Sequence, residues 1–263
     1  MSKTTASTSI VTLTTDWGQS DYYCGMLKGR MISACSAIQI VDISHNVPSF
    51  NIHHASFVLR HSYNNFPRNT IHIVMVNSED TVPSRLLLLE NEGHFFIMPD
   101  NGMLDLLFAT PPETVYTIPF DPSGSFASLN VFVDTVTKIH NGTPLKSIGQ
   151  IITDYQQKIA LRATIDESII TGSIIYIDSY RNAITNISRS LFDRVGKGRK
   201  FNIFVQSNHN KITELSLTYN QVDPGELLAV FNSTNLLEIA IRNGYASELL
   251  SLSIGGTVRI NFL

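Results

Sequence analysis

Residues 13–29 read LTTDWGQSDYYCGMLKG and place a carboxylate between a strand pattern and a helix pattern. The β-branched, apolar run at residues 10–14 leads to Asp16 and Gly18, and apolar residues at helical spacing follow. Such a run is typical of a strand buried on both faces of a parallel sheet. Ligands of open α/β sheets bind beyond the carboxyl ends of such strands. Position alone leaves two interpretations of Asp16 open: it caps the following helix, or it accepts two hydrogen bonds from a ribose diol.

The first half of the chain continues this alternation of strand and helix patterns. Further β-branched runs predict strands at residues 38–44 and 70–77, beside the first at 9–16. Apolar residues at helical spacing predict helices at 20–37, 51–66, 101–110 and 130–142, and residues 85–102 predict a hairpin that turns at 91–93. We therefore expect an α/β N-terminal domain with a mostly parallel central sheet, spanning residues 1–150.

The pattern changes near residue 150. Residues 151–263 contain alternating strand patterns with short turns, and one short helix pattern at 188–195. This spacing predicts a smaller antiparallel β-barrel, with a sandwich as the alternative.

Composition limits the classes of function. The chain has 263 residues, 43% hydrophobic and 16% charged, which is typical of a soluble globular protein. A net charge of -3 argues against a nucleic-acid binder, and the basic run at 196–200 fits a solvated turn. No run approaches the roughly 18 apolar residues of a membrane span, and the N-terminus lacks the apolar core of a signal peptide. Cys24 and Cys35 lie in one helical stretch and favour no disulfide, so we expect a cytoplasmic protein.

The sequence gives no metal-site or hydrolase motif. Its eight histidines form neither an i,i+4 pair nor a Cys/His cluster, so we expect helical and surface histidines and no metal. No Gly-x-Ser-x-Gly elbow is present.

Residues 177–188, IDSYRNAITNIS, interrupt an apolar run with hydrogen-bonding side chains. One interpretation is a hairpin turn at residues 179–181. The other is a ligand site in which Asn182 pairs with a base edge, Tyr180 stacks on the base, and Asp178 binds an ammonium group. Both interpretations stay open at this point.

Six stretches together resemble the family of S-adenosylmethionine (SAM) hydroxide adenosyltransferases, which includes the fluorinases and chlorinases. They are LTTDWGQSDYYCGMLKG, IVDISHNVPSFNI, MPDNGML, GSIIYIDSYRNAITNI, PGELLAVFNS and LEIAIRNGYASELL, in this order and nearly end to end. The resemblance implies an N-terminal α/β domain and a C-terminal β-barrel, in agreement with the patterns above.

The resemblance also implies roles in the first half of the chain. Asp16 would hold the ribose diol of SAM, and Phe50 would pack over the ribose. Further substrate-binding residues implied by the matched motifs are Trp17, Asp21, Tyr23 and Asn101.

In the second half, Asp178 would bind the methionine ammonium and Asn182 would hydrogen-bond the adenine. Tyr180 and Tyr219 would flank the adenine, and Arg242 and Asn243 lie in a segment whose backbone would read its edge. Sites in this family lie between the N-domain of one subunit and the C-domain of its neighbour, usually in a trimer. The resemblance therefore implies a homotrimer whose small-molecule substrate is SAM.

The sequence departs from the family at the residues that position the attacking water. An aspartate, an arginine and a histidine do this in the hydroxide-transferring members, and their places fall at Asn77, Ser84 and Ala127. Arg85 would supply the arginine after a one-residue slip. Ser128 falls where the fluorinases have a serine that contacts the halide.

Displacement at the ribose C5′ by water, giving adenosine and L-methionine, is the leading hypothesis. Methionine leaves from a sulfonium without needing a proton, so an aligned nucleophile is most of the requirement and we expect no cofactor. Glu79 and Asp80 lie in the same loop as Asn77 and could replace the aspartate, although their charge would repel a halide. The alternatives are a SAM-binding sensor that has lost catalysis and a SAM-dependent halogenase.

Overall fold

The computed structural model describes residues 8–78, 84–110 and 112–263. The chain forms two compact units, Met1–Ile159 and Ala160–Leu263. The sequence put the boundary at residue 150, and the first unit extends past it because β7 (Gln150–Ile152) pairs with the strand β6 (Val115–Pro119) of the first sheet.

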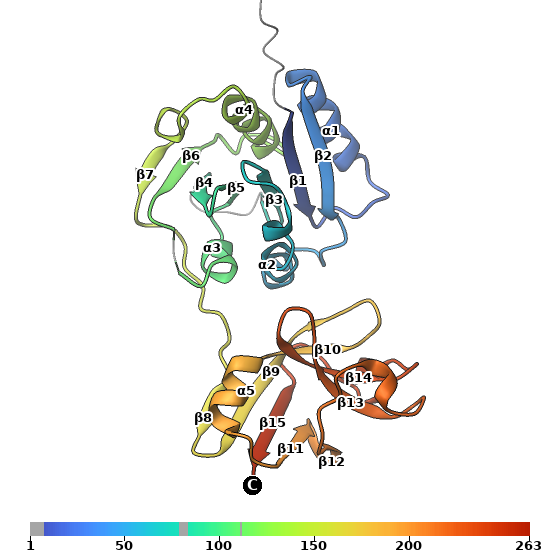
Figure 1. Ribbon diagram of the computed structural model, residues 1–263. Helices are drawn as coiled ribbons and strands as arrows, with labels where there is room; N and C mark the ends of the chain where they lie inside the picture. Colours follow the sequence, from blue (N-terminus) through green and yellow to red (C-terminus); the bar gives the residue numbers. More distant parts are fainter. Residues whose placement is uncertain (1–7, 79–83, 111) are drawn as a thin grey trace, which may run out of the picture. The chain divides into compact units, whose positions relative to one another are not determined.

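Three parallel pairings form one half of the first sheet. Strand β1 (Ser9–Thr15) lies between β2 (Ile38–Ser44) and β3 (Ile71–Met75), and β3 pairs in parallel with β5 (His94–Pro99). The carboxyl ends of β1, β2 and β3 therefore meet at one edge (Figure 1). This arrangement confirms the strands expected from the β-branched runs.

The other half of this sheet is antiparallel, so the sheet is mixed. The hairpin of β4 (Arg85–Asn91) and β5 reverses the chain direction, and β6 and β7 add antiparallel strands beyond β4. The full strand order is β2-β1-β3-β5-β4-β6-β7. Prolines flank the short strand β6, which explains why the sequence pattern did not predict it.

Helices cover both faces of the first sheet. Helices α1 (Tyr22–Ala34) and α4 (Ser128–His140) lie side by side, and their apolar side chains Leu27, Met31 and Phe132 pack with Leu13 and Ile73 of the sheet (Figure 1). Helices α2 (Ile52–Arg60) and α3 (Met103–Leu107) form a second contacting pair. Short 3-10 turns lie at Tyr63–Asn65 (η1) and Leu145–Ser147 (η2).

The second unit is an antiparallel, barrel-like sheet in the order β12-β11-β15-β9-β10-β14-β13, with β8 paired to β9. The two ends of this order, β12 and β13, contact each other, so the sheet is nearly closed. Its strands are β8 (Thr164–Asp166), β9 (Ile169–Ile177), β10 (Ala183–Ser188), β11 (Phe201–Val205), β12 (Ser207–Ile212), β13 (Leu227–Phe231), β14 (Leu236–Ile241) and β15 (Thr257–Phe262). Helices α5 (Arg189–Gly196) and α6 (Ala246–Leu249) and the 3-10 turn η3 (Tyr219–Gln221) complete the unit.

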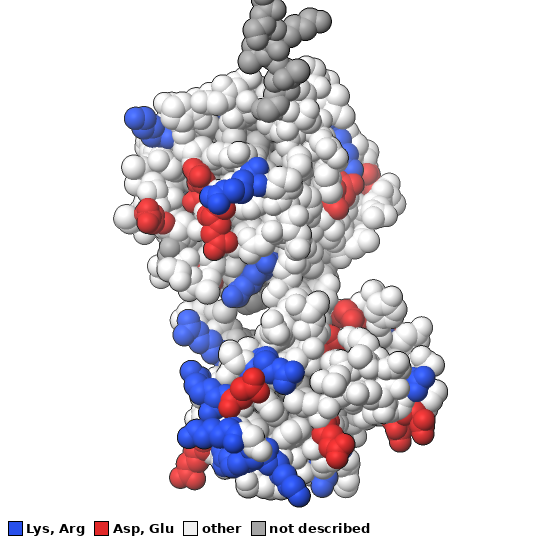
Figure 2. All heavy atoms as spheres, viewed as in Figure 1, with Lys and Arg blue, Asp and Glu red and all other residues white. Residues whose placement is uncertain are grey.

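Lys and Arg side chains gather on the face of the second unit that carries α5 (Figure 2). The basic run at residues 197–200 is exposed directly after that helix, as expected of a solvated turn. Its Arg199 donates to the carbonyls of Val195 and Gly196 at the end of α5, where a cation stabilises the helix. No helix in the described part of the chain is long and apolar enough to cross a membrane.

Candidate functional site

Asp16 lies at the carboxyl edge of the parallel strands, directly after β1. Its Oδ2 accepts hydrogen bonds from the backbone N–H of Phe50, at 2.8 Å, and of Asn77, at 3.4 Å. Its Oδ1 has no hydrogen-bond partner among the described residues. The N-cap of α1 is Asp21, and no side chain caps that helix, so Asp16 is not a helix cap. The carboxylate is thus held through one of its two oxygens.

The two amides that hold Asp16 come from left-handed backbone. Phe50 has φ +64° and Asn77 has φ +49°. Such angles are uncommon for residues other than glycine and cluster at functional sites. Phe50 is also 72% exposed, so this backbone holds an aromatic ring out toward solvent beside the carboxylate. Phe50 and Asn77 thus both contact Asp16 through their backbone amides.

Buried His45 braces the turn that carries Asp16. Its Nδ1 lies 2.8 Å from Thr15 Oγ1, and its carbonyl accepts from the N–H of Gly18 at 2.7 Å. Its Nε2 lies 3.1 Å from Asp42 Oδ1, and Lys28 Nζ lies 2.6 Å from the other oxygen. Burial opposes the charge of Asp42, but the bonds from Lys28 and His45 outweigh it and lower the pKa of Asp42.

An aromatic cluster lies on the α1 side of this turn. Tyr23 stacks on Phe126 with 4.4 Å between ring centroids, and Trp17 meets Phe126 edge-on at 5.5 Å. Exposed Tyr22 lies 4.2 Å from Tyr23 and, through a hydrogen bond, raises the pKa of Tyr23. The cluster joins the predicted residues Trp17 and Tyr23 to the loop before α4. Ser128, the first residue of that helix, is fully buried, whereas Asp21 is exposed.

Asn101 contacts the chain directly after β3, at the carboxyl edge of the parallel strands. Its Nδ2 donates to the carbonyls of Val76, at 3.1 Å, and Asn77, at 3.4 Å, and its Oδ1 accepts from the N–H of Met103 at 3.3 Å. Asn101 is 6% exposed, so its described contacts are those of a residue that fixes the Asn77 turn.

Arg85 is engaged in an ion pair. Its Nε lies 2.7 Å from Oδ2 of fully buried Asp100, and its Nη2 donates to the carbonyl of Asp154 at 2.5 Å. The other oxygen of Asp100 accepts from the N–H of Gln156. The ion pair therefore ties β4 to the segment at 154–156. Glu79 and Asp80 lie outside the described residues.

The second unit brings Asp178, Tyr180 and Asn182 together at the β9–β10 turn. Asp178 Oδ1 accepts from the N–H of Asn182 at 2.8 Å, and the N–H of Asp178 donates to the Asn182 carbonyl at 3.1 Å. The turn interpretation is therefore confirmed, and the turn presents Tyr180 with 74% of its surface exposed. The N–H of Ser247 donates to the carbonyl of Arg181, which ties the start of α6 to this turn.

Tyr219 lies in η3, half-exposed, and its hydroxyl donates to Glu238 Oε1 at 2.7 Å. Burial, then the hydrogen bond and charge of Glu238, and then the charge of Asp178 raise the pKa of Tyr219. Arg242 Nη1 donates to the carbonyl of Val222 at 2.6 Å and holds the end of the η3 segment. Asn243 is exposed in left-handed backbone, with φ +55°.

Sequence reasoning missed several residues at these two places. His45 and Glu238 are buried polar groups that fix Thr15 and Tyr219, and Phe126 completes the aromatic cluster. The expectation of helical and surface histidines missed His45 and also the buried strand residues His72 and His94, whose Nε2 and Nδ1 lie 3.2 Å apart. His72 and Glu238 each lie between two apolar residues in the sequence, which gives no signal of these polar contacts. Residues 8–78, 84–110 and 112–263 contain no group of three His, Cys, Asp or Glu side chains that could hold a metal ion.

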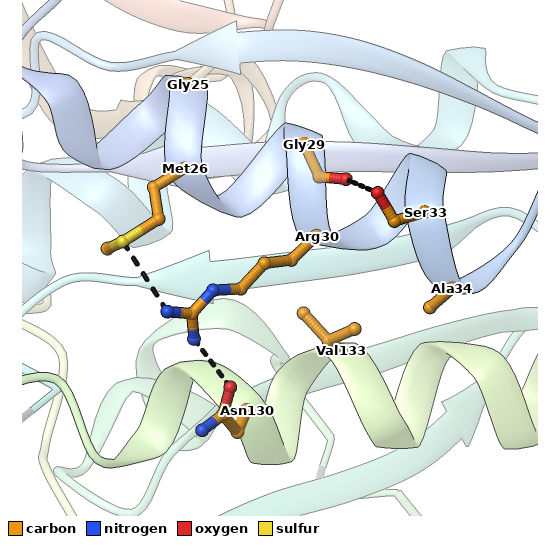
Figure 3. A pocket seen from close by; sticks show the side chains of 8 residues that line it. All are labelled: Gly25, Met26, Gly29, Arg30, Ser33, Ala34, Asn130 and Val133. Carbon is orange, nitrogen blue, oxygen red and sulfur yellow. Dashed lines mark hydrogen bonds between the residues drawn. The ribbon is translucent and has the colours of Figure 1, made fainter.

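A groove of about 610 Å³ lies elsewhere, between α1 and α4 (Figure 3). Arg30 extends across it, donating to Asn130 Oδ1 at 2.6 Å and lying 3.7 Å from Met26 Sδ. Gly25 and Val133 are among the other residues that line it. None of the predicted site residues does so, and the groove is separate from the candidate site.

The two units share one arrangement of side chains. An α/β unit and an antiparallel barrel-like unit each present a carboxylate beside an exposed aromatic residue. Two backbone amides hold Asp16, and one backbone amide holds Asp178.

Comparisons with known proteins identify the family. The SAM hydroxide adenosyltransferase N-terminal domain matches residues 11–149, and the C-terminal domain of the same family matches residues 172–259. The chain belongs to the SAM hydroxide adenosyltransferase family.

Similar proteins match over nearly the whole chain. An (R)-S-adenosyl-L-methionine hydrolase of Methanocaldococcus jannaschii is 26% identical over 92% of each chain. A fluorinase of Actinoplanes sp. is 21% identical over 95% of this chain and 97% of its own. The crystal structure of a conserved protein from Thermotoga maritima has a TM-score of 0.83 at 26% identity, covering 96% of this chain and 99% of that one.

Proposed function

We propose that this protein is a SAM hydrolase, which binds SAM and catalyses displacement at its C5′ by water to give adenosine and L-methionine. One observation carries the proposal: two backbone amides fix the Asp16 carboxylate through Oδ2, and Oδ1 has no hydrogen-bond partner among the described residues. A carboxylate held in this way suits a ribose diol. The family, and relatives named (R)-S-adenosyl-L-methionine hydrolase, support the same substrate.

The proposed reaction balances without a cofactor. The water oxygen forms a bond to C5′, the C5′–sulfur bond breaks, and its electron pair leaves with methionine as a neutral thioether. The attacking water releases one proton. The protein has to bind the nucleoside, align the water and exclude competing solvent, which can lower the barrier substantially.

Asn77 stands where the hydroxide-transferring members of the family carry an aspartate, and an amide side chain is not a base. We infer that water attack proceeds here with positioning and without a strong general base. General-base help is worth roughly 10²–10⁴-fold, so we expect turnover slower than with the complete trio by about that factor.

We further propose a homotrimer with shared sites in the cytoplasm. Each unit carries only half of the proposed ligand contacts, and Phe50 and Tyr180 are 72% and 74% exposed. Exposed aromatic rings of this kind suit closure by a second surface. Buried Cys24 and Cys35 are free thiols, as suits a reducing compartment. Sedimentation analysis with and without SAM tests the assembly: a monomer in both conditions would contradict it.

The test of function is incubation of the purified protein with SAM, with and without chloride, followed by chromatography for adenosine and 5′-chloro-adenosine. We expect adenosine above the buffer blank in both arms. Asp16→Asn keeps the shape but removes the charge, and we expect SAM affinity to fall roughly 10- to 100-fold. Asp134→Asn is the matched control, since Asp134 is exposed and forms an ion pair with Lys138. Equal affinity of both variants would contradict the proposal.

A second candidate is a sensor that binds SAM without turnover. It is favoured by Asn77 and Ala127 and by the engagement of Arg85 with Asp100, which leaves no complete trio in the described residues. SAM binding without any product would select this candidate. A halogenase rests on Ser128 alone, and chloride-dependent loss of SAM would select it.

A further inference from the structure

Glu238 is a buried carboxylate in β14 that the proposed reaction does not use. It is 3% exposed. Its Oε1 accepts the Tyr219 hydroxyl at 2.7 Å, and its Oε2 accepts Asn232 Nδ2 at 3.1 Å. In the described part of the chain no basic side chain lies within ion-pair distance of it. Both partners are donors, which suits an ionised carboxylate because it can only accept.

The orientation of the Asn232 amide is set by its other contacts. Its Oδ1 accepts from the N–H of Thr234 at 3.0 Å, the Thr234 hydroxyl at 2.7 Å and the N–H of Leu236 at 3.3 Å. The amide oxygen therefore faces the turn before β14, and the NH₂ group faces Glu238. This turn, Asn232 and Glu238 form one connected chain of hydrogen bonds that ends at the Tyr219 hydroxyl.

Tyr219 needs such an anchor because it lies on an exposed segment. Tyr219 is 46% exposed, and nearby Leu217 is 77% exposed. The segment has its own cap, in which Gln221 Oε1 accepts from the N–H of Leu217 and Thr218. That cap fixes the backbone, whereas the bond to Glu238 fixes the hydroxyl end of the side chain and so the direction in which the ring extends.

We propose that Glu238, held by Asn232, is a positioning residue that fixes the Tyr219 ring for adenine recognition. The proposal rests on the proposed function, in which Tyr219 flanks the adenine of SAM. A ring that is already ordered loses less side-chain freedom when the ligand binds. Loss of the anchor therefore weakens binding while the ring itself remains.

The test compares Tyr219→Phe, Glu238→Gln and the double variant by calorimetric titration with SAM and with adenosine. We expect each single change to raise Kd roughly 2- to 10-fold. The double variant should bind no worse than the weaker single variant, because both changes remove the same bond. Glu214→Gln, an exposed change in the same unit, is the matched control.

A second readout needs no ligand. Ultraviolet titration of the tyrosines should show one phenol that ionises above the others, absent in Tyr219→Phe and shifted to lower pH in Glu238→Gln. An unshifted phenol in Glu238→Gln would overturn the anchor.

The outcomes separate the two proposals. If the wild type binds SAM and both single variants bind it with the same Kd as the wild type, only the positioning role is overturned. This holds even where thermal stability falls. Additive losses in the double variant would overturn it too. If the wild type binds neither SAM nor adenosine, the proposed function fails and the positioning role fails with it.

Discussion

Arg85 and Asp100 form a partly buried ion pair, with 2.7 Å between Nε and Oδ2. Asp100 is fully buried, and Arg85 also donates to the carbonyl of Asp154. This engagement bears on chemistry, because a one-residue slip of Arg85 was the only way the sequence offered to complete the arginine of the water-positioning trio. The guanidinium instead neutralises a carboxylate that would otherwise be buried alone.

Removing this ion pair should destabilise the fold, and it should not remove a group that acts on the attacking water. We expect Arg85→Met to lower the free energy of unfolding by about 3–5 kcal/mol, because it leaves Asp100 buried and unpaired. Lys138→Met removes an exposed pair with Asp134 and should cost about 1 kcal/mol or less. Urea denaturation measures both. A stable Arg85→Met variant that has lost adenosine release would show instead that Arg85 acts on the water.

Rebuilding the trio should accelerate the reaction. The triple variant Asn77→Asp, Ser84→Arg, Ala127→His restores the residue types of the hydroxide-transferring relatives, and we expect the turnover number to rise roughly 10²–10⁴-fold. The double variant Ser84→Arg, Ala127→His lacks the carboxylate and should gain much less. Equal rates for the wild type, the double and the triple variant would refute this explanation of the substitutions.

Replacing Phe50 by glycine should relieve backbone strain and weaken SAM binding. Glycine adopts φ +64° without the roughly 1–2 kcal/mol penalty of other residues, although its flexibility when unfolded offsets part of the gain. We expect Phe50→Gly to be as stable as the wild type or up to about 1 kcal/mol more stable. Its Kd for SAM should rise roughly 5-fold because ring packing is lost.

Lys197→Gly is the matched control for this change. Lys197 also has positive φ, +51°, at the end of α5, so the substitution relieves strain of the same kind. SAM affinity should not change. An unchanged Kd in Phe50→Gly would remove Phe50 from the proposed site.

Acid should destabilise the protein through the buried histidines. Burial, and to a smaller extent the charge of His94, lower the pKa of His72 from 6.5 to about 3. Between these values the unfolded chain binds more protons than the folded one, so the free energy of unfolding falls as the pH is lowered. We expect a loss of about 1 kcal/mol per pH unit below about pH 6, measured by urea denaturation.

His72→Asn keeps a partner for the Thr12 hydroxyl, which lies 2.7 Å from His72 Nδ1, but does not titrate. It should be less stable at neutral pH and lose less stability in acid than the wild type. His209→Asn alters an exposed histidine and should follow the wild-type curve. Parallel curves for all three proteins would contradict the assignment to His72.

Much of the fold could be predicted from the sequence because burial on both faces leaves a strong pattern. The β-branched runs at residues 9–16, 38–44 and 70–77 match β1, β2 and β3 within two residues at each end. The antiparallel half was harder, since β7 has only three residues and gives no period to recognise. The hairpin of β4 and β5 was readable from its turn at Glu92 and Gly93.

The position of the candidate site could be predicted from the sequence, but the residues that hold its side chains in place could not. A carboxylate directly after the pattern of a buried parallel strand can be recognised in a sequence, so Asp16 could be predicted as a candidate site residue. The left-handed backbone that points the amides of Phe50 and Asn77 at it has no signal in residue type, apart from the tolerance of asparagine. Long-range contacts such as His45 to Thr15 and Glu238 to Tyr219 depend on the fold itself.

The most direct test of the account is the fate of oxygen in a reaction run in oxygen-labelled water. Purified protein is incubated with SAM, and the adenosine is analysed by mass spectrometry, with Asp16→Asn and a protein-free blank alongside. We expect adenosine that carries the label at its 5′ hydroxyl, formed by the wild type well above the blank and much less by Asp16→Asn. Unlabelled adenosine, or none above the blank while SAM stays bound, would contradict it.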